Sequence, residues 1–265
     1  MIAVRALAMI EVAPLLSSES IPQVAKIALA GFAAFAVFPT AQVQSDWTEI
    51  AAALPGIQLT LEGGFFSLGF LLLIIGEGII GITIGFFMTI IFAAFSTAGQ
   101  FFSLQMGFGA SETFDPLAQT ENPLIGQYLN LVAMLTFLAM DGLRELFLGG
   151  FWRSIQALNI IELLHGKDEF LAMIAGALPR LFLDAMIISM PILGTLFLTS
   201  LATGLISKAA PQINLLSEGF PISITVAFVL IMATLPFMVE AFSRVIDSGF
   251  RSLQQLYITV GAQIQ

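Results

Sequence analysis

One apolar stretch limits what this chain can fold into more than any other feature. It runs from Gly64 to Ala98, and Glu77 is the one charged residue within it. A helix that crosses a bilayer once needs about 20 apolar residues, so this stretch is too long for one crossing and marginal for two. Its glycines offer places to bend. The stretch therefore predicts either a helical hairpin or one long kinked helix.

Five further apolar stretches predict the rest of the fold, and they cover residues 2–16, 24–38, 123–150, 170–206 and 220–245. The stretch 170–206 is also too long for one crossing, and Pro191 with Gly194 could bend it. We therefore expect an all-α fold: a polytopic, membrane-embedded helical protein with long kinked helices or helical hairpins. One helical domain is expected over residues 1–265.

The composition indicates a membrane protein and excludes sites that need cysteine or more than one histidine. Hydrophobic residues make up 58% of the chain and charged residues 10%, whereas soluble proteins carry about 25% charged residues. The chain has no Cys and one His, His165, and its net charge of −9 argues against a nucleic-acid partner. The start, residues 1–5, lacks the pattern of a cleavable signal peptide, so none is expected.

The sequence lacks the common catalytic motifs, which predicts that the chain is not an enzyme. The chain contains no HExxH zinc motif, no GxSxG nucleophile motif and no phosphate-binding Walker loop. Gly107 and Gly109 lack the third glycine of a dinucleotide-binding loop. We therefore expect no catalytic residue, no cofactor and no metal.

The connecting segments conflict with a simple up-and-down topology. Residues 39–63 and 99–122 carry acidic residues but no Lys or Arg, and the positive-inside rule would place both outside. A single crossing between them forbids that. Either residues 64–98 cross twice, or the chain is not a simple serpentine in lipid.

Several charged residues lie inside the apolar stretches. Arg180 and Asp184 are four residues apart, as are Glu240 and Arg244, so each pair can neutralise itself on one helix face. An ion or proton relay is the alternative reading. Glu77 has no partner within four residues, and we favour a contact with another subunit over a coupling-ion site.

Small residues in the longest stretch predict close helix packing. Gly81 and Gly85 form a GxxxG pattern, and Gly78 falls near the same face. Such faces let two helices approach closely. The contact could be within the chain or between chains.

Two longer motifs carry a family resemblance. Residues 97–116 read TAGQFFSLQMGFGASETFDP, and residues 210–221 read APQINLLSEGFP. Together, and in this order, they resemble the FliR family (FliR/SctT) of type III export gates, with agreement from about residue 4 to residue 243. Overall resemblance favours the flagellar branch.

This resemblance implies a non-enzymatic subunit of a helical hetero-oligomeric gate. Its partners would be FliP-like and FliQ-like subunits, one FlhB-like subunit and membrane lipid. The gate would conduct unfolded flagellar export substrates across the bacterial inner membrane at the flagellar basal body, with part of the complex on the periplasmic side.

The resemblance also implies a plug in the closed channel, carried by the loop from Met106 to Asp115. Glycine tolerates unusual backbone angles, Met and Phe offer pliable apolar contacts, and an apolar constriction excludes ions by dewetting. The expected plug residues are Met106, Gly107, Phe108, Gly109 and Phe114.

The second motif predicts a turn rather than a site. Pro211, Gly219 and Pro221 are expected to end helices on both sides of residues 208–221. A tight polar turn between two helices follows.

Two other functions remain open from the residues alone. Broken helices and buried carboxylates are typical of a secondary transporter for a small solute or ion, although no internal repeat is evident. An accessory subunit of a respiratory complex is the other, although the chain has no haem or iron–sulfur ligand set.

Overall fold

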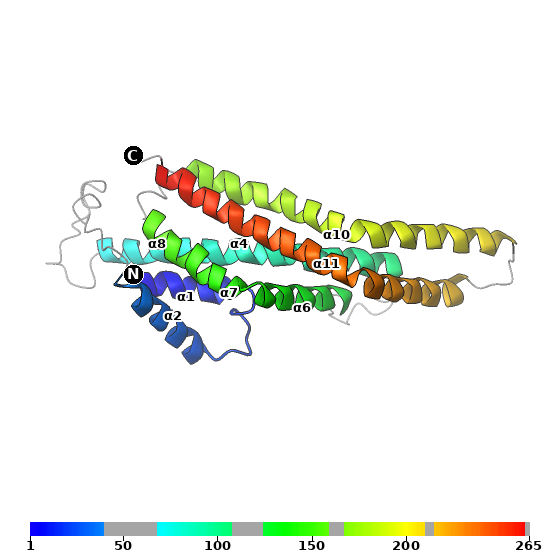
Figure 1. Ribbon diagram of the computed structural model, residues 1–265, viewed down its shortest axis with the longest axis horizontal. Helices are drawn as coiled ribbons and strands as arrows, with labels where there is room; N and C mark the ends of the chain where they lie inside the picture. The colour runs from blue at the N-terminus through cyan, green and yellow to red at the C-terminus, as the bar shows by residue number, and fades with distance from the viewer. Residues whose placement is uncertain (40–67, 108–123, 159–166, 210–214, 263–265) are drawn as a thin grey trace. The chain divides into compact units, whose positions relative to one another are not determined.

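The computed structural model describes residues 1–39, 68–107, 124–158, 167–209 and 215–262, and every element in these ranges is helical (Figure 1). The all-α prediction is therefore confirmed for the described residues. The elements are α1 (Ile2–Val12), α2 (Gln23–Val37), α4 (Leu68–Met106), α6 (Leu124–Ala139), α7 (Gly142–Glu145), the π-helix η2 (Leu146–Trp152), α8 (Arg153–Ala157), α10 (Lys167–Ala209) and α11 (Leu215–Ala262).

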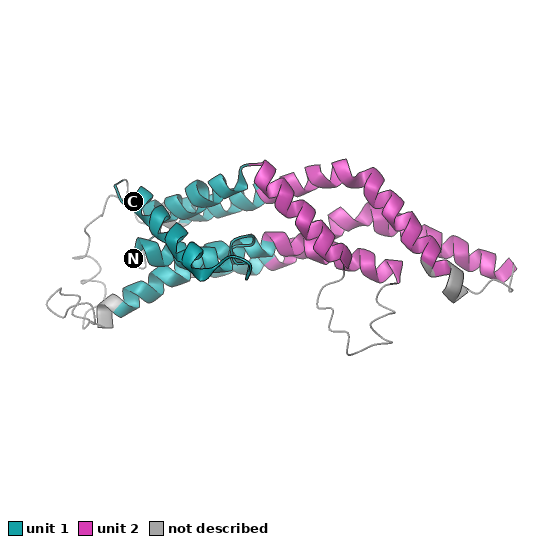
Figure 2. Cartoon of the chain, turned by 90° about the horizontal axis from the view of Figure 1, so that it is seen from below, with its two compact units in different colours: residues 1–90, 141–177, 247–265 teal, residues 91–140, 178–246 magenta. Residues whose placement is uncertain are grey.

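The helices divide into two compact units (Figure 2). Unit 1 comprises residues 1–90, 141–177 and 247–265, and unit 2 comprises residues 91–140 and 178–246. The helices α4, α10 and α11 contribute residues to both units. The expectation of a single domain over the whole chain stays a prediction.

Three helices are much longer than a typical helix of a globular protein. Helix α4 has 39 residues, α10 has 43 and α11 has 48. The windows Leu71–Met106, Ile174–Ala209 and Pro221–Thr259 are long and apolar enough to cross a membrane. Because α4 and α10 are each one uninterrupted helix, the hairpin alternative is wrong for the described part of both stretches.

Local sequence explains several helix ends. Helix α1 stops before Pro14, where Ala13 has an extended backbone with ψ 131°, because proline disfavours a helical residue before it. Helix α2 begins directly after Pro22. Helix α4 ends at Met106, and Gly107 follows with φ 90°, the left-handed conformation that commonly closes a helix.

More of the second motif is helical than the sequence predicts. Helix α10 ends at Ala209 and α11 already begins at Leu215, so Gly219 and Pro221 lie inside α11. Pro221 therefore does not end the helix, and the prediction is wrong at this side of the turn. Membrane-type helices tolerate an interior proline because neighbouring groups satisfy the carbonyl that it leaves free.

The GxxxG pattern of α4 is where α1 packs in unit 1. A side chain at Gly85 would start 2.8 Å from the carbonyl oxygen of Met9, and one at Gly81 would collide with the carbonyl of Arg5. Gly78 has no atom within 4 Å of the same test position. The predicted close packing is confirmed within the chain, but Gly78 is not part of it.

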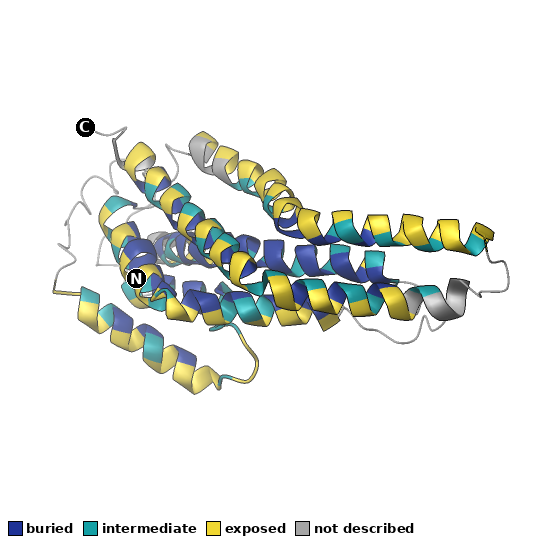
Figure 3. Cartoon of the chain, turned by 45° about the vertical axis from the view of Figure 1, so that its right-hand side comes forward, coloured by how far each residue is buried: buried dark blue, intermediate teal, exposed yellow. Residues whose placement is uncertain are grey.

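Phenylalanines and a second glycine contact build the core of unit 2. The Phe95 ring lies 4.5 Å from that of Phe242 on α11, and the Phe92 ring lies 5.4 Å from that of Phe137 on α6, between ring centroids. At Gly99 an added side chain would start 2.6 Å from the backbone nitrogen of Gly126. Figure 3 shows the contrast between the largely buried α4 and the outer faces of α10 and α11, which are exposed.

Candidate functional site

A buried arginine forms the polar centre of unit 1. Arg5 lies on α1 and is 2% exposed. Its guanidinium pairs with the carboxylate of Glu77 on α4, with Nε–Oε2 and Nη2–Oε1 distances of 2.7 and 2.9 Å. Such a two-point contact is the strong form of the arginine–carboxylate interaction. The two opposite charges can therefore lie inside an apolar bundle because each neutralises the other.

Arg5 also binds the end of α8. Its Nη1 donates to the Ser154 carbonyl at 2.6 Å and to the Ser154 hydroxyl at 3.2 Å, and its Nη2 donates to the Leu158 carbonyl at 2.9 Å. Guanidinium has five N–H donors, and these contacts with the two from Glu77 occupy all of them. The last carbonyls of a helix are unsatisfied and carry partial negative charge, so a cation stabilises this helix end.

This arrangement gives Glu77 a partner in its own chain. Its side chain is 17% exposed, and the neutralising charge comes from Arg5 rather than from a second subunit. An additional contact of Glu77 with another chain stays a prediction. The sequence did contain the signal: Arg5 in one apolar stretch and Glu77 in another each lacked a local partner, and unpaired intramembrane charges tend to pair with one another.

A second polar contact lies beside this pair. The Tyr257 hydroxyl on α11 donates to the Gly150 carbonyl of η2 at 2.9 Å, and Tyr257 is 4% exposed. The Ser154 hydroxyl donates to the carbonyl of Phe151 at 2.7 Å. Neither the π-helix nor the role of Tyr257 was expected from the sequence, because their partners are far apart along the chain.

A third polar contact joins α1 to α2. The Lys26 ammonium is 3.1 Å from the Glu11 carboxylate and 3.2 Å from the carbonyl of Ser17, and Lys26 is buried. Phe32 and Phe35 on the same helix are exposed. Helix α2 thus turns its one charged side chain inward and its bulky apolar side chains outward.

The two predicted intrahelical pairs are present in unit 2. Arg244 contacts Glu240 at 2.8 Å, and Arg180 lies 3.9 Å from Asp184. Both side chains of the first pair are about two-thirds exposed, and Asp184 is 21% exposed. In this chain alone these charges are less buried than the sequence predicts, and their contact with other subunits stays a prediction.

The plug residues lie mostly outside the described part of the chain, since Phe108, Gly109 and Phe114 fall within residues 108–123. Met106 is described and is fully buried at the end of α4. Gly107 follows with its left-handed backbone. Helix α4 thus ends, before the expected plug loop, at a buried residue.

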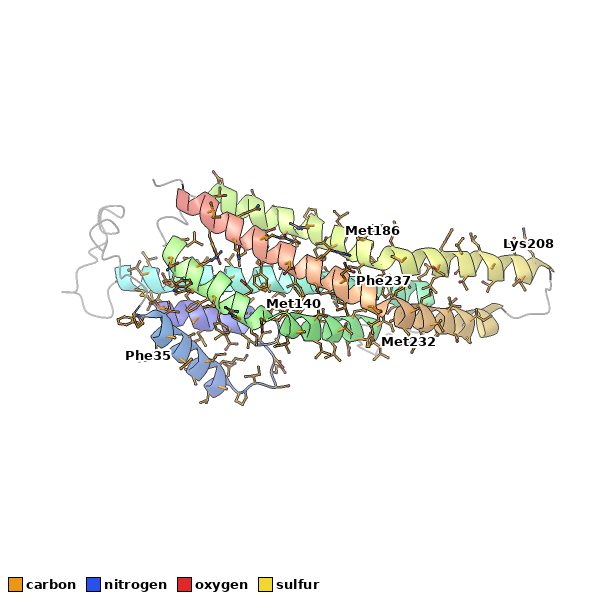
Figure 4. All side chains as sticks on the ribbon, in the orientation of Figure 1. Phe35, Met140, Met186, Lys208, Met232 and Phe237 are labelled. Atoms are coloured by element: carbon orange, nitrogen blue, oxygen red, sulfur yellow. The ribbon has the colours of Figure 1, made fainter. Side chains whose placement is uncertain are left out.

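Large apolar side chains point outward from the long helices. Figure 4 labels Met186 on α10 and Met232 and Phe237 on α11, which are among the exposed hydrophobic residues. In water this surface would favour association. Among the described residues no group of three His, Asp or Glu could hold a metal ion.

Comparison with known proteins places the chain in a family. The model of the family described as "Bacterial export proteins, family 1" matches residues 1–249. The chain belongs to this family, the FliR family. The FliR-family chain is 30% identical to flagellar biosynthetic protein FliR of Escherichia coli (strain K12) over 256 residues, which covers 95% of this chain and 89% of that protein.

Two further relatives match over a similar length. Flagellar biosynthetic protein FliR of Bacillus subtilis (strain 168) is 26% identical over 250 residues, covering 94% of this chain and 90% of that protein. The FliR of Pectobacterium carotovorum subsp. carotovorum is 31% identical over 262 residues, covering 96% of this chain and 91% of that protein. The similarity to FliR proteins is therefore not limited to the two sequence motifs but covers nearly the whole FliR-family chain.

The first family motif now has a structural meaning in this FliR-family chain. Its Gly99 is the point where α4 meets Gly126 of α6, and its Gly107 closes α4. Both positions need glycine, the first for lack of space and the second for its backbone angle. The motif therefore fixes how the helix ends before the following loop.

Proposed function

We propose that this chain is a non-enzymatic channel subunit of the flagellar type III protein export gate. It forms the pore for unfolded export substrates with FliP-like and FliQ-like subunits and one FlhB-like subunit. The gate lies in the bacterial inner membrane at the flagellar basal body, with part of the complex on the periplasmic side. Family membership over residues 1–249 carries this proposal.

The length of the apolar helices supports an assembly rather than a single chain in lipid. The window Ile174–Ala209 has 36 residues, about 54 Å of helix at 1.5 Å per residue, against about 30 Å of hydrocarbon. The window carries exposed apolar residues along its whole length, such as Phe182, Phe197 and Leu205. Partner subunits would keep the part that exceeds the hydrocarbon out of water.

The end of α4 supports a plug at the following loop. Met106 is buried at the end of α4, and Gly107 ends the helix in a left-handed conformation, so the loop is attached to a fixed point. The loop that follows Met106 and Gly107 would close the channel with Phe108, Gly109 and Phe114, and it would part around an unfolded polypeptide.

Co-purification tests the assembly. The tagged chain, extracted in mild detergent, is expected to bring FliP-like and FliQ-like chains with it, identified by native mass measurement. Cells that lack the chain are expected to lose flagellar protein secretion. A chain that purifies alone, with secretion intact in its absence, would contradict the proposal.

A deletion tests the plug. Removing residues 108–115 leaves buried Met106 and the end of α4 in place, and it is expected to make the membrane permeable to ions while the complex still assembles. A deletion of equal length within residues 46–53, also outside the described part of the chain, serves as the control. An intact ion barrier in the 108–115 deletion would remove the plug assignment.

Neither alternative function gains a specific observation. A solute transporter would need a free intramembrane carboxylate for its coupling ion, and the best candidate, Glu77, is held by two hydrogen bonds from Arg5.

A further inference from the structure

The π-helix η2 is a segment whose register is set by contacts from outside it. It spans seven residues, Leu146–Trp152, with Gly149 and Gly150 next to each other. π-Helices are rare, occur mostly as single turns and are frequent at functional sites, and glycine weakens any helix. The local sequence alone therefore gives little preference for this register over an ordinary α-helix.

Two side chains from other helices hold η2 and the helix that follows it. The Tyr257 hydroxyl binds the Gly150 carbonyl inside η2. Arg5 binds the carbonyls of Ser154 and Leu158 at the end of α8. Tyr257 comes from α11 and Arg5 from α1, so two distant parts of the chain fix the same segment.

These contacts are specific to the π register. If η2 became α-helical with the same number of residues, everything beyond it would turn by about 100° and shift by about 1.5 Å. After such a change Ser154 and Leu158 would present their carbonyls away from Arg5. At Gly149 an added side chain would start 2.6 Å from the carboxylate of Glu145, an exposed side chain that can move aside.

We propose that η2 is a two-register switch, held in its π form by Arg5 and Tyr257, and that the export gate uses the change of register. Release of either contact lets η2 become α-helical and turns α8. Movement of the C-terminal part of α11 is thereby coupled to α1 and its partner Glu77. This inference rests on the proposed function only where it concerns the gate.

Amide hydrogen exchange of the assembled complex in lipid nanodiscs tests the clamp. Tyr257→Phe removes one hydroxyl and keeps the ring, so exchange across residues 146–157 should accelerate about tenfold, the factor expected for one lost hydrogen bond of about 1.4 kcal/mol. Tyr128→Phe is the matched control because Tyr128 on α6 is 40% exposed, and it should leave exchange in 146–157 unchanged. Unchanged exchange in Tyr257→Phe would overturn the clamp.

A deletion tests the switch itself. Removing Gly149 takes the extra residue out of η2, so the segment can be α-helical while α8 stays bound to Arg5, and it can no longer change register. The variant is expected to assemble with its partners and to lose secretion of export substrates, whereas Gly78→Ala, at a position with no atom within 4 Å, should export normally. Normal secretion in the Gly149 deletion would overturn the switch.

Two further outcomes separate this inference from the proposed function. Failure of the unaltered chain to bind FliP-like and FliQ-like subunits would remove the proposed function, while exchange in the purified chain would still test the clamp. If the Gly149 deletion fails to assemble, Glu145→Ala together with Gly149→Ala favours the α-helix without changing its length, because alanine has a higher helix propensity than glycine and the first change removes the side chain nearest to the added methyl group. Lost export with unchanged exchange in that variant would overturn the switch, and lost export with faster exchange in 146–157 would support it.

Discussion

Arg5 and Glu77 are 72 positions apart in the sequence, yet their side chains form a two-point ion pair in the interior of unit 1. The pair joins α1 to α4 at the turn where the glycines of α4 let the two helices touch. A close backbone approach and a matched pair of charges thus occur at one place, so neither α1 nor α4 can shift without disturbing both.

Removing one partner of this pair should be strongly destabilising. Arg5→Ala leaves a carboxylate and two carbonyls unsatisfied, and breaking a buried pair in this way costs about 3–5 kcal/mol. The thermal unfolding midpoint in detergent should fall accordingly. The double variant Arg5→Met with Glu77→Leu should recover part of the loss, because no buried charge remains. Additive losses in the double variant would contradict this account.

The pair Glu240–Arg244 should behave differently. Its side chains are about two-thirds exposed, and exposed pairs contribute little to stability. Arg244→Ala is therefore expected to leave the unfolding midpoint of the isolated chain unchanged while lowering the yield of the assembled complex. An unchanged yield would argue against a subunit contact at this position.

A side chain at Gly85 should disturb the packing of α1 on α4. A methyl group there would start 2.9 Å from the Cβ of Val12, and overpacking of this kind costs about 1–3 kcal/mol. Gly85→Ala should lower the unfolding midpoint. Gly78→Ala is the matched control, since that position is open and alanine favours a helix. Equal behaviour of the two variants would show that α1 does not pack here.

The backbone angle of Gly107 should control where the proposed plug loop leaves α4. Its φ of 90° strains any residue with a side chain by about 1–2 kcal/mol. Gly107→Val is expected to raise ion leakage through the closed gate, measured as loss of membrane potential in cells. Gly107→Asn should leak less, because Asn tolerates this conformation better than other residues.

Much of the fold follows from the sequence alone, because hydropathy and periodicity are local properties. Long apolar stretches determined that the chain is helical and suited to a membrane. Because Arg180 and Asp184 are four residues apart, as are Glu240 and Arg244, the sequence alone also predicted these two ion pairs on their helices. The family motifs gave the resemblance that the match over residues 1–249 confirms.

Only the tertiary structure decided how those helices are used. In the folded chain Arg5 pairs with Glu77, the Tyr257 hydroxyl donates to a carbonyl of η2, and α11 continues through Pro221. A contact between residues far apart in sequence depends on the packing of whole helices, and a π register or a tolerated proline depends on neighbours that satisfy the backbone. No window of adjacent residues contains that information.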